Sequence, residues 1–154
     1  MIHEFWLLQT NEWSYSPHHN IHALRKHPTH ITLHDTILWY MSDSLEWIET
    51  ANPAMRNQPG YGLNMYGLTM ITEQGATRFE SVLTTWAALF CHGPETLRLT
   101  GEWMFYNPYK GKRNNGRYEV IMIERDPLVT TLRTLAEYAR SVQAGQHFIL
   151  HFGL

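Results

Sequence analysis

The sequence predicts an α+β fold, with a mixed, mostly antiparallel sheet of about six strands and three helices packed mainly on one face. Three observations lead to this prediction. Several segments alternate between apolar and polar residues, or are rich in β-branched and aromatic residues, as strands are. Two longer segments carry apolar residues at the spacing of one helical face. The strand segments follow one another directly and also flank helices, which is typical of α+β proteins.

Six segments are predicted as strands from their residue types and their alternation. They are Ile2 to Gln9, Thr29 to Met41, Leu63 to Thr72, Thr96 to Tyr106, Tyr118 to Glu124 and Gln146 to Leu154. The two segments around the turn-rich stretch 107–117 are expected to form a hairpin. Strict alternation places the apolar residues of its first strand on one face: Leu97, Leu99, Trp103 and Phe105. The apolar density of the last segment indicates that it pairs inside the sheet.

The longest helix is predicted to begin at Gly75 and to end at the stop signal Gly93-Pro94. Its apolar residues follow the i, i+3, i+4, i+7 pattern: Phe79, Val82, Leu83, Trp86, Leu89 and Phe90. A second long helix is expected after Asp126, with Pro127 at its first position. Its apolar stripe consists of Leu128, Leu132, Leu135, Ala139 and Val142, and Gly145 ends it.

Residues 42–62, between the second and third predicted strands, are expected to form a short helix and a loop. A short helix is predicted over SLEWIETA, beginning at Ser42 or Asp43 and ending at Asn52-Pro53. The stretch from Asn52 to Gly62 is rich in turn-forming residues and is predicted as a long loop.

Composition bounds the class of protein. Hydrophobic residues make up 44% of the 154 residues and aromatic residues 13%, which predicts one globular domain, residues 1–154, with a real core. The formal net charge of −2 argues against a general electrostatic grip on nucleic acid or on anionic lipid. Cys91 is the single cysteine, so no intrachain disulfide forms, and at the end of a helix it is expected to be buried and inert.

Localisation follows from the same observations. The N-terminal stretch lacks the basic region of a signal peptide, and no apolar run has the length of a membrane span. We therefore expect a cytoplasmic protein with no membrane partner.

Histidines are concentrated between His18 and His34. The six are His18, His19, His22, His27, His30 and His34, with Glu12 and Asp35 as the nearby carboxylates. His18 and His22 have the i, i+4 spacing of a zinc pair, but no HExxH motif is present and the ligand set is incomplete. No metal site is predicted, and the alternative is a His-dependent metal hydrolase or ribonuclease that uses this cluster.

The stretch 107–117 is basic. It contains Lys110, Lys112, Arg113 and Arg117 without an acidic residue, and tyrosines accompany it. Cations with aromatic rings suit phosphates and stacked bases, and they also suit an acidic protein surface. A nucleic-acid-binding adaptor is the second alternative, although the overall charge does not favour specific nucleic-acid binding.

No catalytic or cofactor motif stands out in the sequence. The glycines at 60, 62 and 67 precede a strand, whereas a phosphate-binding loop follows a strand and opens a helix. No nucleophile–base pair and no carboxylate pair are evident. We therefore predict no catalytic residue and no cofactor, and expect a protein that is not an enzyme.

A partner-binding surface is predicted on the connecting segments. The stretch from Asn52 to Gly62 contains Met, Arg and Tyr, which are enriched in interfaces, and loops on a rigid scaffold commonly carry function. The residues predicted to contact a partner are Arg56, Tyr61, Tyr109, Lys110, Lys112 and Arg113.

At the segment NPAMRNQPGYGLNMYGLTMI, with WAALF and the closing FILHFGL, the chain resembles small bacterial immunity proteins of polymorphic or contact-dependent growth inhibition systems. The shared features are glycines and aromatic residues that maintain a fold, so the resemblance carries over no functional residue. It implies a cytoplasmic, non-enzymatic protein that binds one cognate toxin domain and blocks its active site. An immunity protein is therefore the main functional expectation.

Overall fold

A computed structural model describes residues 1–16, 21–105 and 116–153 of the chain. In chain order its elements are β1 (Ile2–Gln9), η1 (Ile21–Lys26), β2 (Ile31–His34), α1 (Asp35–Tyr40), α2 (Ser42–Leu45), β3 (Glu49–Asn52), η2 (Pro53–Met55), β4 (Gln58–Tyr61), β5 (Leu68–Ile71), α3 (Glu73–Cys91), β6 (Thr96–Phe105), β7 (Gly116–Glu124), α4 (Arg125–Gln143) and β8 (His147–Phe152), where η denotes a 3-10 helix. This order confirms the α+β class.

Six of the strands form one sheet in the order β2-β1-β8-β5-β3-β4, and every neighbouring pair in it is antiparallel. The C-terminal strand β8 lies between β1 and β5, with His151 opposite both Phe5 and Thr69. The prediction that the last strand pairs inside the sheet is therefore confirmed. Its apolar density follows from this position, because both faces of a central strand are covered.

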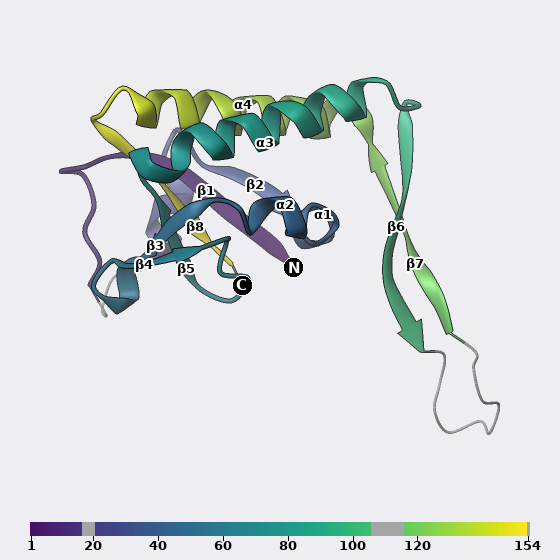
Figure 1. The fold of residues 1–154 in the computed structure, drawn as a ribbon, viewed down its shortest axis with the longest axis horizontal. Coiled ribbons are helices and arrows are strands. Elements are labelled where there is room, and N and C mark those ends of the chain that lie inside the picture. Colours follow the sequence, from purple (N-terminus) through teal and green to yellow (C-terminus); the bar gives the residue numbers. More distant parts are fainter. Residues whose placement is uncertain (17–20, 106–115, 154) are drawn as a thin grey trace.

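The strands of this sheet are not the six that the sequence predicted. The segments 96–106 and 118–124 form a hairpin, as expected, but β6 and β7 pair only with each other. Their places in the sheet are taken by β3 and β4. Figure 1 shows the two-stranded ribbon β6–β7 extending away from the rest of the molecule.

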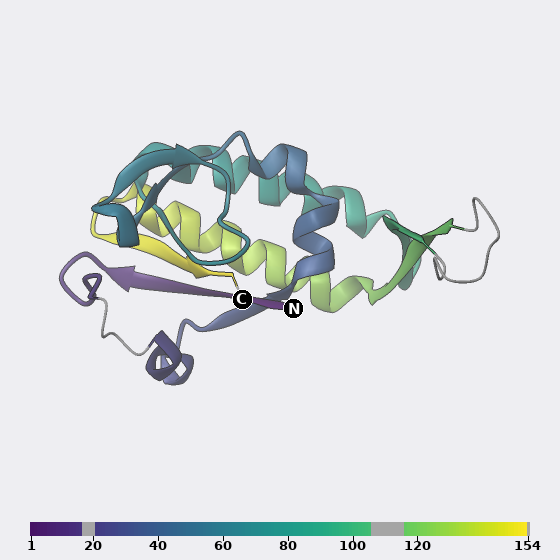
Figure 2. The same cartoon turned by 90° about the horizontal axis from the view of Figure 1, so that it is seen from below.

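The two long helices cover one face of the six-stranded sheet, where they lie side by side (Figures 1 and 2). The predicted stripe of α4 is buried throughout. On α3 the stripe is buried at Phe79, Val82, Leu83 and Phe90, whereas Leu89 is exposed. Gly75 allows the start of α3 to approach β3 closely, because a Cβ at this position would overlap the carbonyl oxygen of Glu49.

The opposite face of the sheet is covered by the segment that follows β1. Trp6, Leu8, Phe148 and Leu150 form a second apolar cluster there, and Trp13 packs against it. The Trp6 indole donates a hydrogen bond of 2.8 Å to the Leu24 carbonyl, which holds η1 against this face. The prediction of helices mainly on one face is correct, because the described residues that cover the other face form a short 3-10 helix and irregular structure.

The predicted strand Thr29 to Met41 is wrong after His34. β2 pairs with β1 up to His34 opposite Ile2, the first residue of β1, and the next residues leave the sheet. The segment turns into α1 instead. His34 caps this helix by accepting from the Thr36 amide, and the N-terminal amine lies 3.1 Å from the Asp35 carboxylate in its first turn.

The predictions for residues 42–72 also need correction. The short helix ends at Leu45 rather than at Asn52, and Glu49–Asn52 is a strand. The expected loop Asn52 to Gly62 contains η2 and β4, and β4 pairs with β3 as a hairpin at the edge of the sheet. The following strand is limited to Leu68–Ile71, because a turn fixed by the Asn64 amide donating to Thr69 Oγ1 precedes it.

None of the helices in the described ranges is long and apolar enough to cross a membrane.

Candidate partner-binding site

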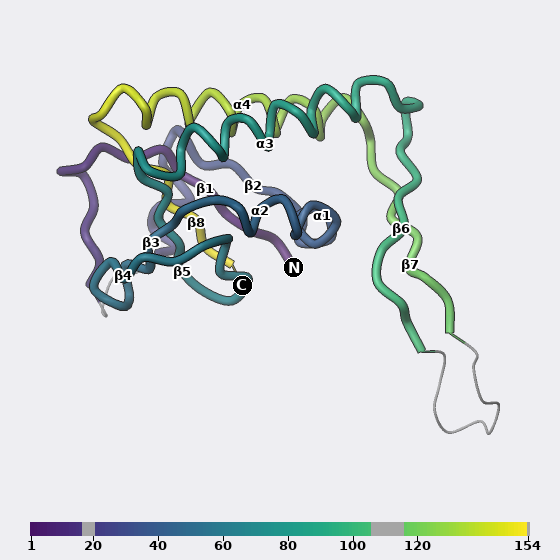
Figure 3. The backbone as a smooth tube through the Cα atoms, viewed as in Figure 1, coloured from purple at the N-terminus to yellow at the C-terminus, as the bar shows by residue number. Residues whose placement is uncertain are grey.

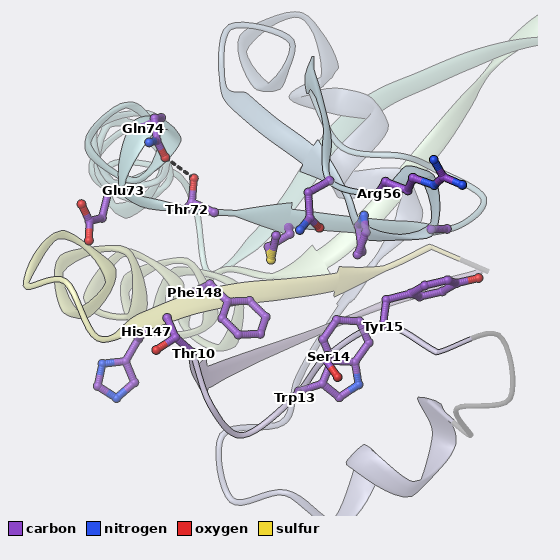
Figure 4. Close-up of a pocket in the computed structure, with 14 residues that line it drawn as sticks. Thr10, Trp13, Ser14, Tyr15, Arg56, Thr72, Glu73, Gln74, His147 and Phe148 are labelled. Carbon is purple, nitrogen blue, oxygen red and sulfur yellow. Dashed lines mark hydrogen bonds between the residues drawn. The ribbon is translucent and has the colours of Figure 1, made fainter.

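An open hollow of about 890 Å³ lies where the chain leaves β1, enters α3 and enters β8 (Figure 4). It is lined by residues from four separate segments: Thr10, Trp13, Ser14 and Tyr15; Pro53, Ala54, Arg56 and Asn57; Met70, Thr72, Glu73 and Gln74; and His147 and Phe148. We call this feature the 56-hollow, after the one predicted partner-binding residue that lines it.

Aromatic side chains form the floor of the 56-hollow. Trp13 is buried against Phe148, with ring centroids 6.2 Å apart. A turn directs Trp13 back onto the sheet, because the Gln9 amide donates to the Glu12 carboxylate at 3.0 Å and the Glu12 amide donates to the Gln9 carbonyl. The hydrogen bond from the Gln9 amide also lowers the pKa of Glu12, with a further contribution from His27. The turn that follows β1 thus positions Trp13 in the floor of the hollow.

Arg56 lies on the rim of the hollow in an uncommon backbone conformation. Arg56 and Asn57 are consecutive residues with φ of 56° and 58°, which non-glycine residues rarely adopt. The turn is held at its other end, where the Asn52 side chain accepts from the Ala54 amide at 3.0 Å. Figure 4 shows Arg56 above the aromatic side chains of Trp13 and Tyr15. Such backbone strain is common at functional sites, and here it directs an exposed cation to the rim.

The far end of the 56-hollow is polar. It is formed by the first turn of α3, where Thr72 Oγ1 donates to the Gln74 side chain and Glu73 follows, and by His147 at the start of β8. The hollow therefore combines an apolar floor, a cation on one rim and hydrogen-bonding groups at the other end.

Tyr61 is the last residue of β4, at the end of the strand that lies away from Arg56. It is paired with Glu49, and its side chain is exposed. It lines two smaller hollows of about 330 and 510 Å³ along the same β3–β4 hairpin. Asn57 lines the larger of these two as well as the 56-hollow, so the hollows form one continuous surface along the hairpin.

The other predicted contact residues lie outside the part of the chain that the structure describes: Tyr109, Lys110, Lys112 and Arg113. The described strands on either side of them, β6 and β7, extend from the opposite side of the molecule from the β3–β4 hairpin (Figure 1). Their part of the predicted surface therefore stays a prediction.

The aromatic floor was missed at the sequence level. Trp13 and Tyr15 stand in an otherwise polar stretch, TNEWSYS, and large aromatic residues there are a signal that this stretch returns to the protein body. Phe148 belongs to a strand predicted correctly, but no local pattern shows which segment covers it.

The described histidines of the cluster take part in structural contacts. His27 bridges Glu12 and Thr29, with nitrogen–oxygen distances of 2.9 and 2.8 Å. His30 stacks on Trp6, and His34 caps α1. Across residues 1–16, 21–105 and 116–153, no three His, Cys, Asp or Glu side chains converge to hold a metal ion. His18 and His19 lie outside these ranges.

Two buried polar contacts were not predicted. Glu4 is almost fully buried and accepts a hydrogen bond of 2.6 Å from Arg25 Nε. His3 and His151 are fully buried on the helix-covered face, and His3 Nδ1 lies 2.8 Å from His151 Nε2. Burial, and secondarily the charge of His3, hold the pKa of His151 well below its ordinary value; burial also lowers the pKa of His3.

Cys91 is exposed, which corrects the expectation of a buried thiol. It lies at the end of α3, and Arg133 of α4 donates to its Sγ at 3.2 Å.

Comparisons of the chain with protein-family models, with curated proteins and with solved structures found no match.

Proposed function

We propose that this chain is a non-enzymatic binding protein that holds a partner protein on the 56-hollow and the β3–β4 hairpin. In line with the resemblance of its sequence to immunity proteins, the partner is a cognate toxin domain that the chain neutralises in the cytoplasm. The observation that carries the proposal is the turn with positive φ at Arg56 and Asn57, which presents Arg56 beside an aromatic-floored hollow.

The extent of the surface favours a protein over a small ligand. One hollow of about 890 Å³ is within the range of a small-molecule site, but two further hollows continue from it along the same hairpin. Exposed Tyr and Arg side chains stand along this surface at Tyr61, Tyr15 and Arg56. These residue types dominate the energy of protein interfaces when they enter or border a pocket.

The chemistry of the hollow indicates what the partner brings. An apolar or aromatic side chain suits the floor of Trp13 and Phe148. A carboxylate beside that side chain suits Arg56, because a guanidinium pairs with a carboxylate through two parallel hydrogen bonds. Binding of this kind blocks a toxin by covering its surface and requires no reaction.

The first test is co-purification of the untagged chain with the product of its neighbouring gene, followed by protection of cells that express this product. A chain that purifies alone, beside a neighbour without toxicity, would remove the toxin part of the proposal.

The second test locates the surface. Arg56→Glu should weaken the complex by about 30-fold or more, because it replaces an attractive charge at a hot spot with a repulsive one. Arg133→Glu is the matched control, since Arg133 is also exposed but lies beside Cys91, at the opposite end of α3 from the 56-hollow. Equal affinities of the two variants, measured by isothermal calorimetry, would place the interface elsewhere.

A further inference from the structure

Among its described residues, the β6–β7 ribbon packs against the main core at its base. Leu97 and Ile121 are buried in the main core, and Leu99 and Ile123 pack against it. Farther along, the two strands continue together away from the body and cross over each other (Figures 1 and 3). A two-stranded ribbon by itself is at best marginally stable in water, so the outer part needs a surface to pack against.

A β-bulge determines which side chains face outward. Thr100 is opposite Val120 and Trp103 is opposite Tyr118, so Gly101 and Glu102 together face the single residue Glu119. The extra residue reverses the alternation of β6. Trp103 and Phe105 therefore lie on the face opposite Leu97 and Leu99, which corrects the prediction that all four share one face.

As a result, five large apolar side chains gather on the face that points away from the core: Trp103, Phe105, Tyr118, Val120 and Met122. Their exposed fractions run from 46% to 81%. Together they expose roughly 600 Å², which is at the upper end of the largest apolar patch on a typical monomer. We call them the ribbon patch.

The ribbon patch is ordered by contacts among its own members. Trp103 meets Tyr118 edge to face, with ring centroids 4.9 Å apart, and meets Phe105 in the same way at 6.5 Å. The indole of Trp103 lies over Gly116, where a Cβ would overlap the ring. These contacts present a shaped aromatic surface, of the kind that packs in interface cores.

We propose that the ribbon patch packs against the same patch of a second copy of this chain, so that the protein is a two-fold symmetric dimer. A second copy is present whenever the chain is, so it covers the patch whether or not the partner of the 56-hollow is bound. Two patches facing each other bury about 1,200 Å², the lower bound for a specific interface, and the polar rim adds to it. A single apolar face suits an isologous contact, in which each patch packs on its own equivalent.

The opposite face of the ribbon supplies a matched control. Met104 and Met122 are both exposed, at 54% and 60%, on the same ribbon. Met122 belongs to the ribbon patch, whereas Met104 is paired with Arg117 on the other face. Replacing either methionine by glutamate therefore makes the same change of side chain and charge. The two variants differ only in the face of the ribbon that carries the new charge.

The experiment is sedimentation velocity of the full chain from about 1 to about 200 µM, a range that covers dissociation constants in the micromolar region. We expect the wild type and Met104→Glu to have twice the monomer mass. Met122→Glu should be monomeric, with a dissociation constant raised at least 30-fold, because the dimer would bury its charge. Val120→Glu is a second variant of the patch and should behave like Met122→Glu.

Far-ultraviolet circular dichroism and the melting temperature of each variant show that its body is folded. A wild type that stays monomeric over the whole range overturns the proposal. So does equal dissociation of Met104→Glu and Met122→Glu, since the patch would then not be the contact. These outcomes leave the proposal for the 56-hollow unaffected, because no residue of the ribbon lines that hollow.

Discussion

Mild acid should destabilise the protein through the buried pair His3–His151. Both imidazoles are fully buried and lie 2.8 Å apart, and burial lowers the pKa of each, which favours the neutral rings in the folded state. His3 Nε2 and His151 Nδ1 have no hydrogen-bond partner among the described residues. A proton added to either ring places an unpaired charge in the core, whereas the unfolded chain takes up that proton in water.

The sign and size of the effect follow from linkage. The pKa of His151 is lowered on folding, so the unfolded state binds more protons, and stability is complete above the ordinary pKa and is lost as the pH falls below it. With an unfolded pKa near 6.5, the free energy of unfolding should be about 1.4 kcal/mol smaller at pH 5.5 than at pH 7.5 or above, from His151 alone. The lowered pKa of His3 acts in the same direction.

The measurement is urea unfolding followed by circular dichroism in steps between about pH 5 and pH 8, a window above the pKa of ordinary carboxylates. The double variant His3→Leu/His151→Leu should lose most of the slope, because it removes both titrating groups together. His147→Gln, at the start of the same strand, should keep the slope. The reasoning is refuted if the wild type has the same free energy of unfolding at pH 5.5 and 7.5, or if the double variant retains the full slope.

Two further predictions concern stability. Gly75→Ala should lower the free energy of unfolding by about 3 kcal/mol or more, because its Cβ would overlap the Glu49 carbonyl, whereas Gly60→Ala has its nearest side-chain atom at 4.0 Å and should cost less than about 1 kcal/mol; thermal unfolding of both variants compares them. Arg25→Leu should cost about 2 kcal/mol, because it leaves the buried Glu4 carboxylate without its cation. Adding Glu4→Gln should recover part of that loss in urea titrations, and no recovery would mean that the charge is not the cause.

The two long helices and the first and last strands of the chain were predictable because their signals are local. The apolar stripes of α3 and α4 repeat at the helical period. The Gly93-Pro94 pair follows the end of α3, and Gly145 follows the end of α4. The apolar density of β8 indicated a central strand, and its place between β1 and β5 agrees. These features depend on neighbours within a few residues.

The errors occurred where a segment needed a partner that the local pattern does not specify. The alternation from Thr29 to Met41 fits a strand throughout, but β1 offers pairing only as far as Ile2. Residues 49–52 and 58–61 become strands because they pair with each other at the open edge beyond β5. In β6 a single bulge reverses the faces of Trp103 and Phe105, and no rule of alternation predicts where a bulge falls.

The candidate site shows the same division. Sequence composition alone selected Arg56 and Tyr61 as exposed interface residues, because turn-rich stretches remain on the surface and carry interface-forming side chains. The floor beneath Arg56 joins Trp13 to Phe148, and the buried pair joins His3 to His151, across separations that span almost the whole chain. The sequence thus determined the two long helices and the exposure of the turn-rich stretch around Arg56 and Tyr61, since period and turn composition are local properties. The tertiary structure decided which distant side chains meet, because strand pairing and the bulge set the register that brings them together.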